Sequence, residues 1–250
     1  MELLKAASQA LQRHAANVAL YIGGNVSLSM AYIAVQVFLT QQNPDFDTAP
    51  TTAERLIDVI ALLVATVGWA LLQSVVFSRI GRELDRPLWK VADDREAIRR
   101  FFPLWFEFNL VLNTLMWLGR TIATYESIKD AAALPLLFSL GALVVLVPFG
   151  ASIMFHGRFS WNTLGESLAP LGRRLPQLAI VFALTAFQVV IMLFLDRQLP
   201  ETFDGEFVQT VIYKVAIISA LSWLDCMVFT ATWLVCKDDR DSPDEFDLDF

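Results

Sequence analysis

The chain has 250 residues, of which 56% are hydrophobic and only 18% are charged. Soluble domains have nearer 45–50% apolar and about 25% charged residues, so this composition excludes an ordinary soluble domain. Almost all of the formal net charge of −7 comes from residues 238–250, whose net charge is −6, so the acidic balance describes the C-terminal end and not the rest of the chain.

The apolar residues collect in six blocks, each about as long as the ~20 residues that a helix needs to cross ~30 Å of hydrocarbon. A first block of this length exceeds the apolar region of a signal peptide, so we interpret it as a retained span. We predict an all-α polytopic membrane protein with six transmembrane helices in one membrane domain, residues 1–237. The predicted spans are residues 15–39, 56–77, 101–123, 131–155, 175–195 and 208–235.

Similar amphipathic segments precede the first, third and fifth blocks: AASQALQRHAANVALY, DDREAIRRFFPLWFEF and GESLAPLGRRLPQLAI. A positive flank on each membrane helix is enough to explain their Arg residues. Their recurrence before odd-numbered spans also suggests a threefold repeat of an interfacial helix and a helical hairpin. We therefore expect amphipathic interfacial helices before the odd-numbered spans.

The Lys and Arg residues are distributed unequally between the two sides of the predicted membrane domain. Fourteen of the 19 fall at the termini and in the loops on the same side as the termini. Because Lys and Arg accumulate in cytoplasmic loops, we predict that the N-terminus and the C-terminus both lie in the cytoplasm.

Five polar residues within the third and sixth blocks form a candidate intramembrane site: Glu107, Asn109, Asn113, Lys214 and Asp225. At 100° per residue, Glu107 lies on one stripe of the third helix, and the two asparagines lie on another roughly 140° away. Two polar stripes on nearly opposite faces predict a central third helix that is covered on both sides.

The depths of these residues follow from the helical rise of ~1.5 Å per residue. Asp225 and Asn113 fall near the middle of the bilayer, and Glu107 is shallower, at about 9 Å. Lys214 falls near the outer boundary together with Asp58 and Arg120, where we expect a cluster of ion pairs.

These polar residues have two interpretations. Inserting a charged side chain at the middle of the membrane costs at least ~2.5–3.5 kcal/mol of free energy. A charged residue at that depth is therefore a candidate for a functional role. The other explanation for a polar residue in a span is a hydrogen bond to a neighbouring helix, which is worth about 0.6–2 kcal/mol. We favour the second interpretation for Asn109 and Asn113, a structural or partner-pairing role for Glu107, and leave both open for Asp225.

No motif indicates catalysis, a metal or a cofactor: the sequence has no Walker loop, HExxH or GxSxG pattern. Cys226 and Cys236 are ten residues apart on one predicted helix, about 15 Å along its axis, which is beyond the reach of a disulfide. We expect both thiols to be reduced, and the protein to be neither an enzyme nor a metalloprotein.

The last segment, residues 238–250, has a charge density that excludes a packed core, so we predict a disordered cytoplasmic tail. Phe246, Leu248 and Phe250 alternate with acidic residues. This alternation is typical of a segment that becomes ordered on a basic, grooved partner, and an inert solubilising tail is the alternative.

In its length, its six blocks and the segments LKAASQALQRHAANVAL and LGESLAPLGRRLPQLAIV that open hairpins, the chain resembles the YciC-type bacterial inner-membrane proteins. It is also similar to the membrane part of some glycerophosphodiester phosphodiesterases. The resemblance implies a multi-pass protein of the bacterial inner membrane, without the catalytic domain of the phosphodiesterases.

Two functions remain open. The first is a non-enzymatic inner-membrane protein that organises partner proteins or lipids, with the tail as a docking element for a cytoplasmic protein. The alternative is a small-solute or ion transporter that uses the polar residues of the third and sixth helices, although the paired broken helices and inverted repeat typical of many carriers are missing. We expect no nucleic-acid partner.

Overall fold

The computed structural model describes residues 2–42, 52–85, 91–123, 131, 133–157, 169, 172–193 and 205–241. Within these ranges there are seven main helices and no strand, which confirms the prediction of an all-α protein. The helices are α1 (Glu2–Arg13), α2 (Ala15–Gln42), α3 (Thr52–Leu84), α4 (Asp94–Ala123), α5 (Ala133–Phe155), α7 (Leu175–Leu193) and α8 (Gly205–Asp241).

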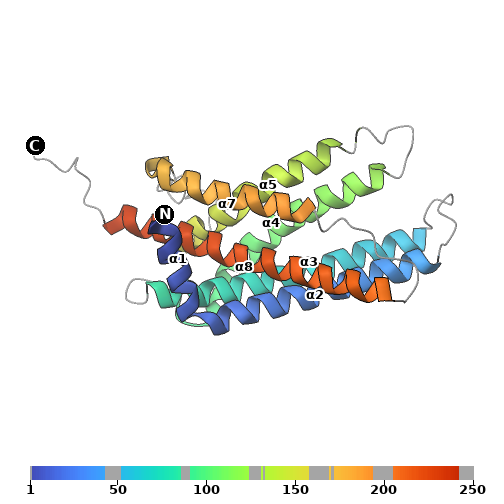
Figure 1. Cartoon of the computed structure of the whole chain (residues 1–250), viewed down its shortest axis with the longest axis horizontal. Coiled ribbons are helices and arrows are strands. Elements are labelled where there is room, and N and C mark those ends of the chain that lie inside the picture. The colour runs from blue at the N-terminus through green and yellow to red at the C-terminus, as the bar shows by residue number, and fades with distance from the viewer. Residues whose placement is uncertain are drawn as a thin grey trace, which may run out of the picture.

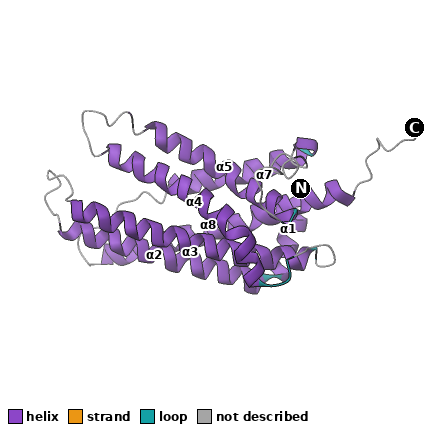
Figure 2. Ribbon diagram, turned by 180° about the vertical axis from the view of Figure 1, so that it is seen from behind, coloured by secondary structure: helices purple, strands orange, loops and turns teal. Residues whose placement is uncertain are grey.

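The long helices run side by side in one elongated bundle (Figures 1 and 2). α8 packs against α2, α5 and α7, while α3 joins α2 to α4 and α4 joins α3 to α5. The start of α1 and the end of α8 lie at the same end of the bundle, which we call the terminal end (Figure 1).

Four helices are long and apolar enough to cross a membrane: Ala15–Leu39, Thr52–Leu84, Asp94–Gly119 and Gly205–Asp241. Two shorter apolar helices, Val144–Phe155 and Leu175–Ile191, fall within the fourth and fifth predicted spans. By length and composition, the chain is therefore a membrane-embedded helical protein.

Helix α1 is the amphipathic segment expected before the first span. A turn at His14 separates it from α2, and its apolar residues Ala7 and Leu11 are buried in the main core. α1 packs mainly against α8, so its apolar face is covered by protein. His14 and Asn17 both pair with Glu83, which ties the start of α2 to the end of α3.

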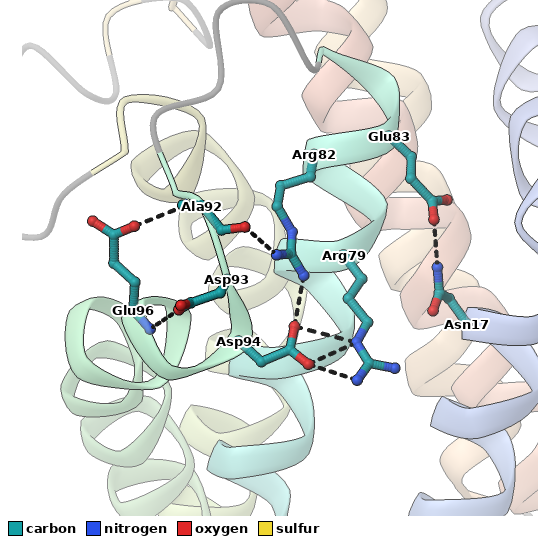
Figure 3. Close-up of polar contacts among 8 residues, drawn as sticks. All are labelled: Asn17, Arg79, Arg82, Glu83, Ala92, Asp93, Asp94 and Glu96. Carbon is teal, nitrogen blue, oxygen red and sulfur yellow. Dashed lines mark hydrogen bonds and ion pairs between the residues drawn. The ribbon is translucent and has the colours of Figure 1, made fainter.

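The segment before the third span does not form a separate interfacial helix, contrary to our expectation. α4 runs unbroken from Asp94 to Ala123 and includes Pro103. Its start is capped by Asp93, which accepts a hydrogen bond from the Glu96 N–H at 2.7 Å, while Glu96 accepts one from the Ala92 N–H at 2.8 Å (Figure 3). These two hydrogen bonds stabilise a helix start in the surface segment, and the same helix continues into the span.

An ion-pair cluster joins the end of α3 to the start of α4 (Figure 3). The Asp94 carboxylate binds Arg79 at 2.6 Å and Arg82 at 2.6 Å, and Arg82 also donates to the Ala92 carbonyl oxygen at 2.8 Å. Two cations on one carboxylate at a helix N-terminus hold the two helices together at the terminal end.

Large, fully buried aromatic side chains pack together toward the terminal end. Phe77 of α3 stacks on Phe229 of α8 with 4.4 Å between ring centroids and meets Trp105 of α4 edge-on at 5.3 Å. Toward the opposite end many large apolar side chains are exposed, as expected for contact with lipid: Leu56, Ile60, Val64, Leu134, Leu137, Phe138, Val208 and Ile212.

Helix α8 is longer than the sixth predicted span and continues to Asp241. Its last turns are held by Asp85, which binds Arg240 at 2.6 Å and lies 4.0 Å from Lys237. Residues 238–241 therefore belong to the helix and not to a disordered tail, which corrects the predicted boundary. Residues 242–250, including Phe246, Leu248 and Phe250, lie outside the described residues.

Cys226 and Cys236 are both free and buried in α8, which confirms the prediction of reduced thiols. The Cys236 thiol contacts the Ser152 hydroxyl of α5 at 3.5 Å.

Gly150 provides a test of the packing at the terminal end. A Cβ at this position would overlap the Trp105 indole, whereas a Cβ at Gly141 of the same helix meets no atom within 4 Å. We expect Gly150→Ala to lower the free energy of unfolding by about 1–3 kcal/mol through overpacking. Gly141→Ala should be neutral or slightly stabilising, because Ala favours a helix over Gly by about 1 kcal/mol.

The measurement is SDS titration of both purified variants in mixed detergent micelles, followed by Trp fluorescence. Equal stability of the two variants would contradict the close approach of α5 to Trp105.

Candidate functional site

Asp225 of α8 lies between two other helices. One carboxylate oxygen accepts a hydrogen bond from the Tyr21 hydroxyl of α2 at 3.1 Å, and the other accepts one from the Gln188 amide of α7 at 2.7 Å. The Gln188 amide also approaches the Leu221 carbonyl oxygen at 3.3 Å. One carboxyl group therefore connects three helices.

Polar side chains continue from Tyr21 into the rest of the bundle. The Gln73 side chain of α3 lies close to the Tyr21 hydroxyl, and the Asn109 amide of α4 donates a hydrogen bond to the Gln73 carbonyl oxygen at 2.6 Å. The order Asn109–Gln73–Tyr21–Asp225–Gln188, which we call the polar chain, thus passes through α4, α3, α2, α8 and α7.

Two further side-chain pairs lie one to two turns from the polar chain. The Asn25 amide of α2 donates to the Ser222 hydroxyl of α8 at 2.7 Å. The Asn113 amide of α4 donates to the Thr66 hydroxyl of α3 at 3.0 Å. Asn109 and Asn113 therefore both make hydrogen bonds between helices, which is the role that we favoured for them from the sequence.

The structure divides the five residues of the candidate site among different places. Asp225 and Asn109 belong to the polar chain, and Asn113 lies one turn from Asn109. Lys214 is buried in α8 but is eleven residues from Asp225, about 16 Å along the axis. Glu107 is on the other side of α4 and is not part of the polar chain.

Asp58 of α3 is the centre of a second cluster. Its carboxylate accepts hydrogen bonds from the Gln36 amide at 2.5 Å, the Trp117 indole at 2.9 Å and the Tyr32 hydroxyl at 3.3 Å. Among the described residues Asp58 therefore binds neutral donors, and not the cations that we expected near it. The Arg120 side chain lies outside the described residues.

The prediction of a fully covered third helix is wrong for one of its two faces. The Asn109 and Asn113 face is packed against α3, as described above. The face of Glu107 is open, because Val111 and Thr114 on the same stripe are exposed. α4 is flanked by α3 and α5, and neither covers this stripe.

Sequence reasoning missed Tyr21, Gln73 and Gln188, which make up most of the polar chain. All three lie inside predicted apolar blocks. The argument that drew attention to Asp225, that a polar group in a span needs a partner, applies equally to a lone glutamine in an apolar block. That signal was present in the sequence for Gln73 and Gln188.

The geometry of the polar chain suits a fixed junction. Tyr21, Gln73 and Gln188 are buried, and each side chain finds a partner on another helix. A satisfied buried network makes a bundle rigid and specifies one packing arrangement. In the described part of the chain, no three His, Cys, Asp or Glu side chains come together as a metal site would require.

Comparison with known proteins gives no relative of this chain. No protein-family model matches it, and no match is found among curated proteins or solved structures. The resemblance to the YciC-type proteins therefore stays a prediction.

A double-mutant cycle tests whether the polar chain acts as one unit. Asn109 bonds Gln73, and Gln73 lies close to the Tyr21 hydroxyl, so we expect Tyr21→Phe and Asn109→Leu to be coupled by at least about 0.5 kcal/mol in the free energy of unfolding. Asn113→Leu is the matched control, because Asn113 bonds Thr66 and not Gln73. Its effect should add to that of Tyr21→Phe within about 0.5 kcal/mol.

The free energies come from SDS titration in mixed micelles. Additive effects in both cycles would mean that Gln73 does not link Tyr21 to Asn109.

Proposed function

We propose that this protein is a non-enzymatic scaffold of the bacterial inner membrane that organises partner proteins, in contact with membrane lipids. In this proposal it has six transmembrane helices, cytoplasmic termini, and amphipathic helices at the membrane surface before the first and fifth spans. The acidic C-terminal tail is a docking element for a cytoplasmic protein.

The observation that carries the proposal is the pairing of Asp225. Both of its carboxylate oxygens are bonded to side chains of other helices, and the polar chain extends these contacts through five helices. A carrier needs a coupling group that gains and loses its ion or proton as the helices move. A carboxylate that holds three helices together favours a fixed platform, which is the property that a scaffold needs.

Helix lengths support six spans. α5 has 23 residues and α7 has 19, which correspond to about 34 Å and 28 Å, close to the ~30 Å of hydrocarbon. The start of α1 and the end of α8 lie at one end of the bundle, which fits an even number of crossings (Figure 1).

Basic side chains at the terminal end support cytoplasmic termini. Arg79, Arg82, Arg100 and Arg240 all make ion pairs there. Since Lys and Arg accumulate on the cytoplasmic side, the terminal end is the cytoplasmic end in this proposal.

Substitution of Asp225 separates the scaffold from the transporter. Asp225→Asn keeps the shape of the side chain and one acceptor oxygen, and its new N–H groups can donate to the Tyr21 hydroxyl oxygen or to the oxygen of a turned Gln188 amide, so a scaffold should lose little stability. Asp225→Leu leaves Tyr21 and Gln188 without their acceptor and should lower the free energy of unfolding by about 1–3 kcal/mol. The measurement is SDS titration in micelles, together with proton flux into proteoliposomes that contain a pH-sensitive dye.

A wild-type proton or ion flux that Asp225→Asn abolishes would overturn the scaffold and establish the transporter. A scaffold shows the same background flux in the wild type and in both variants.

Single-cysteine labelling tests the topology, and with it the cytoplasmic docking role of the tail. Cys226 and Cys236 are buried, so we expect little background reaction. An impermeant maleimide added to intact spheroplasts should modify a cysteine at Asn43, but should reach one at Ser242 only after lysis. Labelling at Ser242 from outside would exclude a cytoplasmic tail and reverse the orientation of every helix.

A further inference from the structure

One stripe of α4 faces away from the rest of the bundle. It consists of Pro103, Glu107, Val111, Thr114 and Leu118, which are spaced three or four residues apart and so share one face of the helix. Val111 is 55% exposed and Leu118 is 39% exposed, while Pro103 and Thr114 are also exposed and Glu107 is half-buried. We call this set the outer stripe of α4.

The two polar members of the outer stripe have no partner in the described part of the chain. No hydrogen bond or ion pair joins Glu107 or Thr114 to another described residue. By contrast, Asn109 and Asn113 on the other face both bond α3. The same helix therefore satisfies its inner polar groups and leaves an ionisable one unpaired on its outer face.

The depth of these groups limits what could bind them. Arg100, which bonds Glu96 and the Gly157 carbonyl oxygen, marks the terminal end of α4. Glu107 is seven residues further along, about 10 Å into the bundle, and Thr114 is another 10 Å deeper. Lipid headgroups lie at the membrane surface, so a headgroup ammonium would have to descend about 10 Å to reach Glu107.

A second copy of the chain is also a poor match. In a symmetric contact the same surface of both copies meets, so two outer stripes would bring one Glu107 against the other. Two carboxylates at this depth repel each other.

We propose that the outer stripe of α4 docks a transmembrane helix of a partner protein, and that this helix carries a Lys or Arg facing Glu107. This inference rests on the scaffold function and names one class of its partners. A helix can present a cation at any depth, and the exposed apolar residues of the stripe supply the packing surface on either side of the pair. An ionisable residue inside a membrane is expected to have a partner, and charge complementarity identifies it here as a cation.

The test uses the full chain and a synthetic partner. The probe is a fluorescent polyleucine transmembrane peptide with one lysine about 10 Å from the peptide end that lies at the terminal end of the bundle. It is mixed with labelled protein in phosphatidylcholine–phosphatidylglycerol vesicles, and energy transfer reports binding. Peptides without lysine, or with the lysine near the opposite end, are the controls.

The lysine peptide should bind about tenfold more tightly than either control peptide, the size of one polar contact between membrane helices. Glu107→Gln should remove this preference, while Glu206→Gln, a carboxylate of α8 far from the stripe, should keep it. Glu107→Lys should bind a peptide with glutamate at the same position, which shows that the charge pair and not a folding defect is responsible.

Three outcomes would overturn the proposal: equal binding of all peptides, unchanged preference in Glu107→Gln, or failure of the charge-reversed pair. Energy transfer between two labelled copies that Glu107→Gln abolishes would assign the stripe to self-association. If added phosphatidylethanolamine abolished the preference for the lysine peptide, Glu107 would instead be assigned to binding the ammonium of a lipid headgroup. The scaffold itself is judged separately, by the flux and stability of the Asp225 variants.

Discussion

A carboxyl group placed among apolar helices has to be satisfied, and the arrangement of this bundle depends on how Asp225 is satisfied. Tyr21 is 204 residues away in sequence and Gln188 is 37 residues away, yet both bond it. Because each donor is on its own helix, the pair of hydrogen bonds fixes the depth of α2 and α7 relative to α8. Gln73 and Asn109 extend this alignment to α3 and α4.

The two ends of the bundle are held in different ways. Toward the terminal end, aromatic rings interlock around Phe77, and ion pairs at Asp85 and Asp94 join helices near their ends. Toward the other end, large apolar side chains are exposed and the neutral donors around Asp58 provide a polar contact. A membrane supplies apolar surroundings for the exposed side chains but no hydrogen bonds, so polar contacts there have to be made within the protein.

Helix α4 connects these structural features to function. Its inner face bonds α3 through Asn109 and Asn113, which fixes how the helix is rotated. That rotation turns Glu107 outward, where the described residues offer it no partner. In the function that we propose, this outward-facing carboxyl group makes the bundle a platform for another membrane helix, and such a platform requires no movement of Asp225.

The sequence by itself determined the class of the molecule. The apolar blocks predicted helices α2, α3, α4, α5, α7 and α8, and the spacing of Cys226 and Cys236 was enough to exclude a disulfide between them. These conclusions hold because hydropathy and helical rise are local properties of a segment.

Only the tertiary structure decided which polar groups meet. It paired Asp225 with Tyr21, gave Asp58 neutral donors, turned Glu107 outward and extended α8 to Asp241 through Arg240 and Asp85. Composition shows that a buried polar group needs a partner, but hydrogen bonds are short and directional. The partner is therefore set by the depth and rotation of helices that are far apart in the sequence.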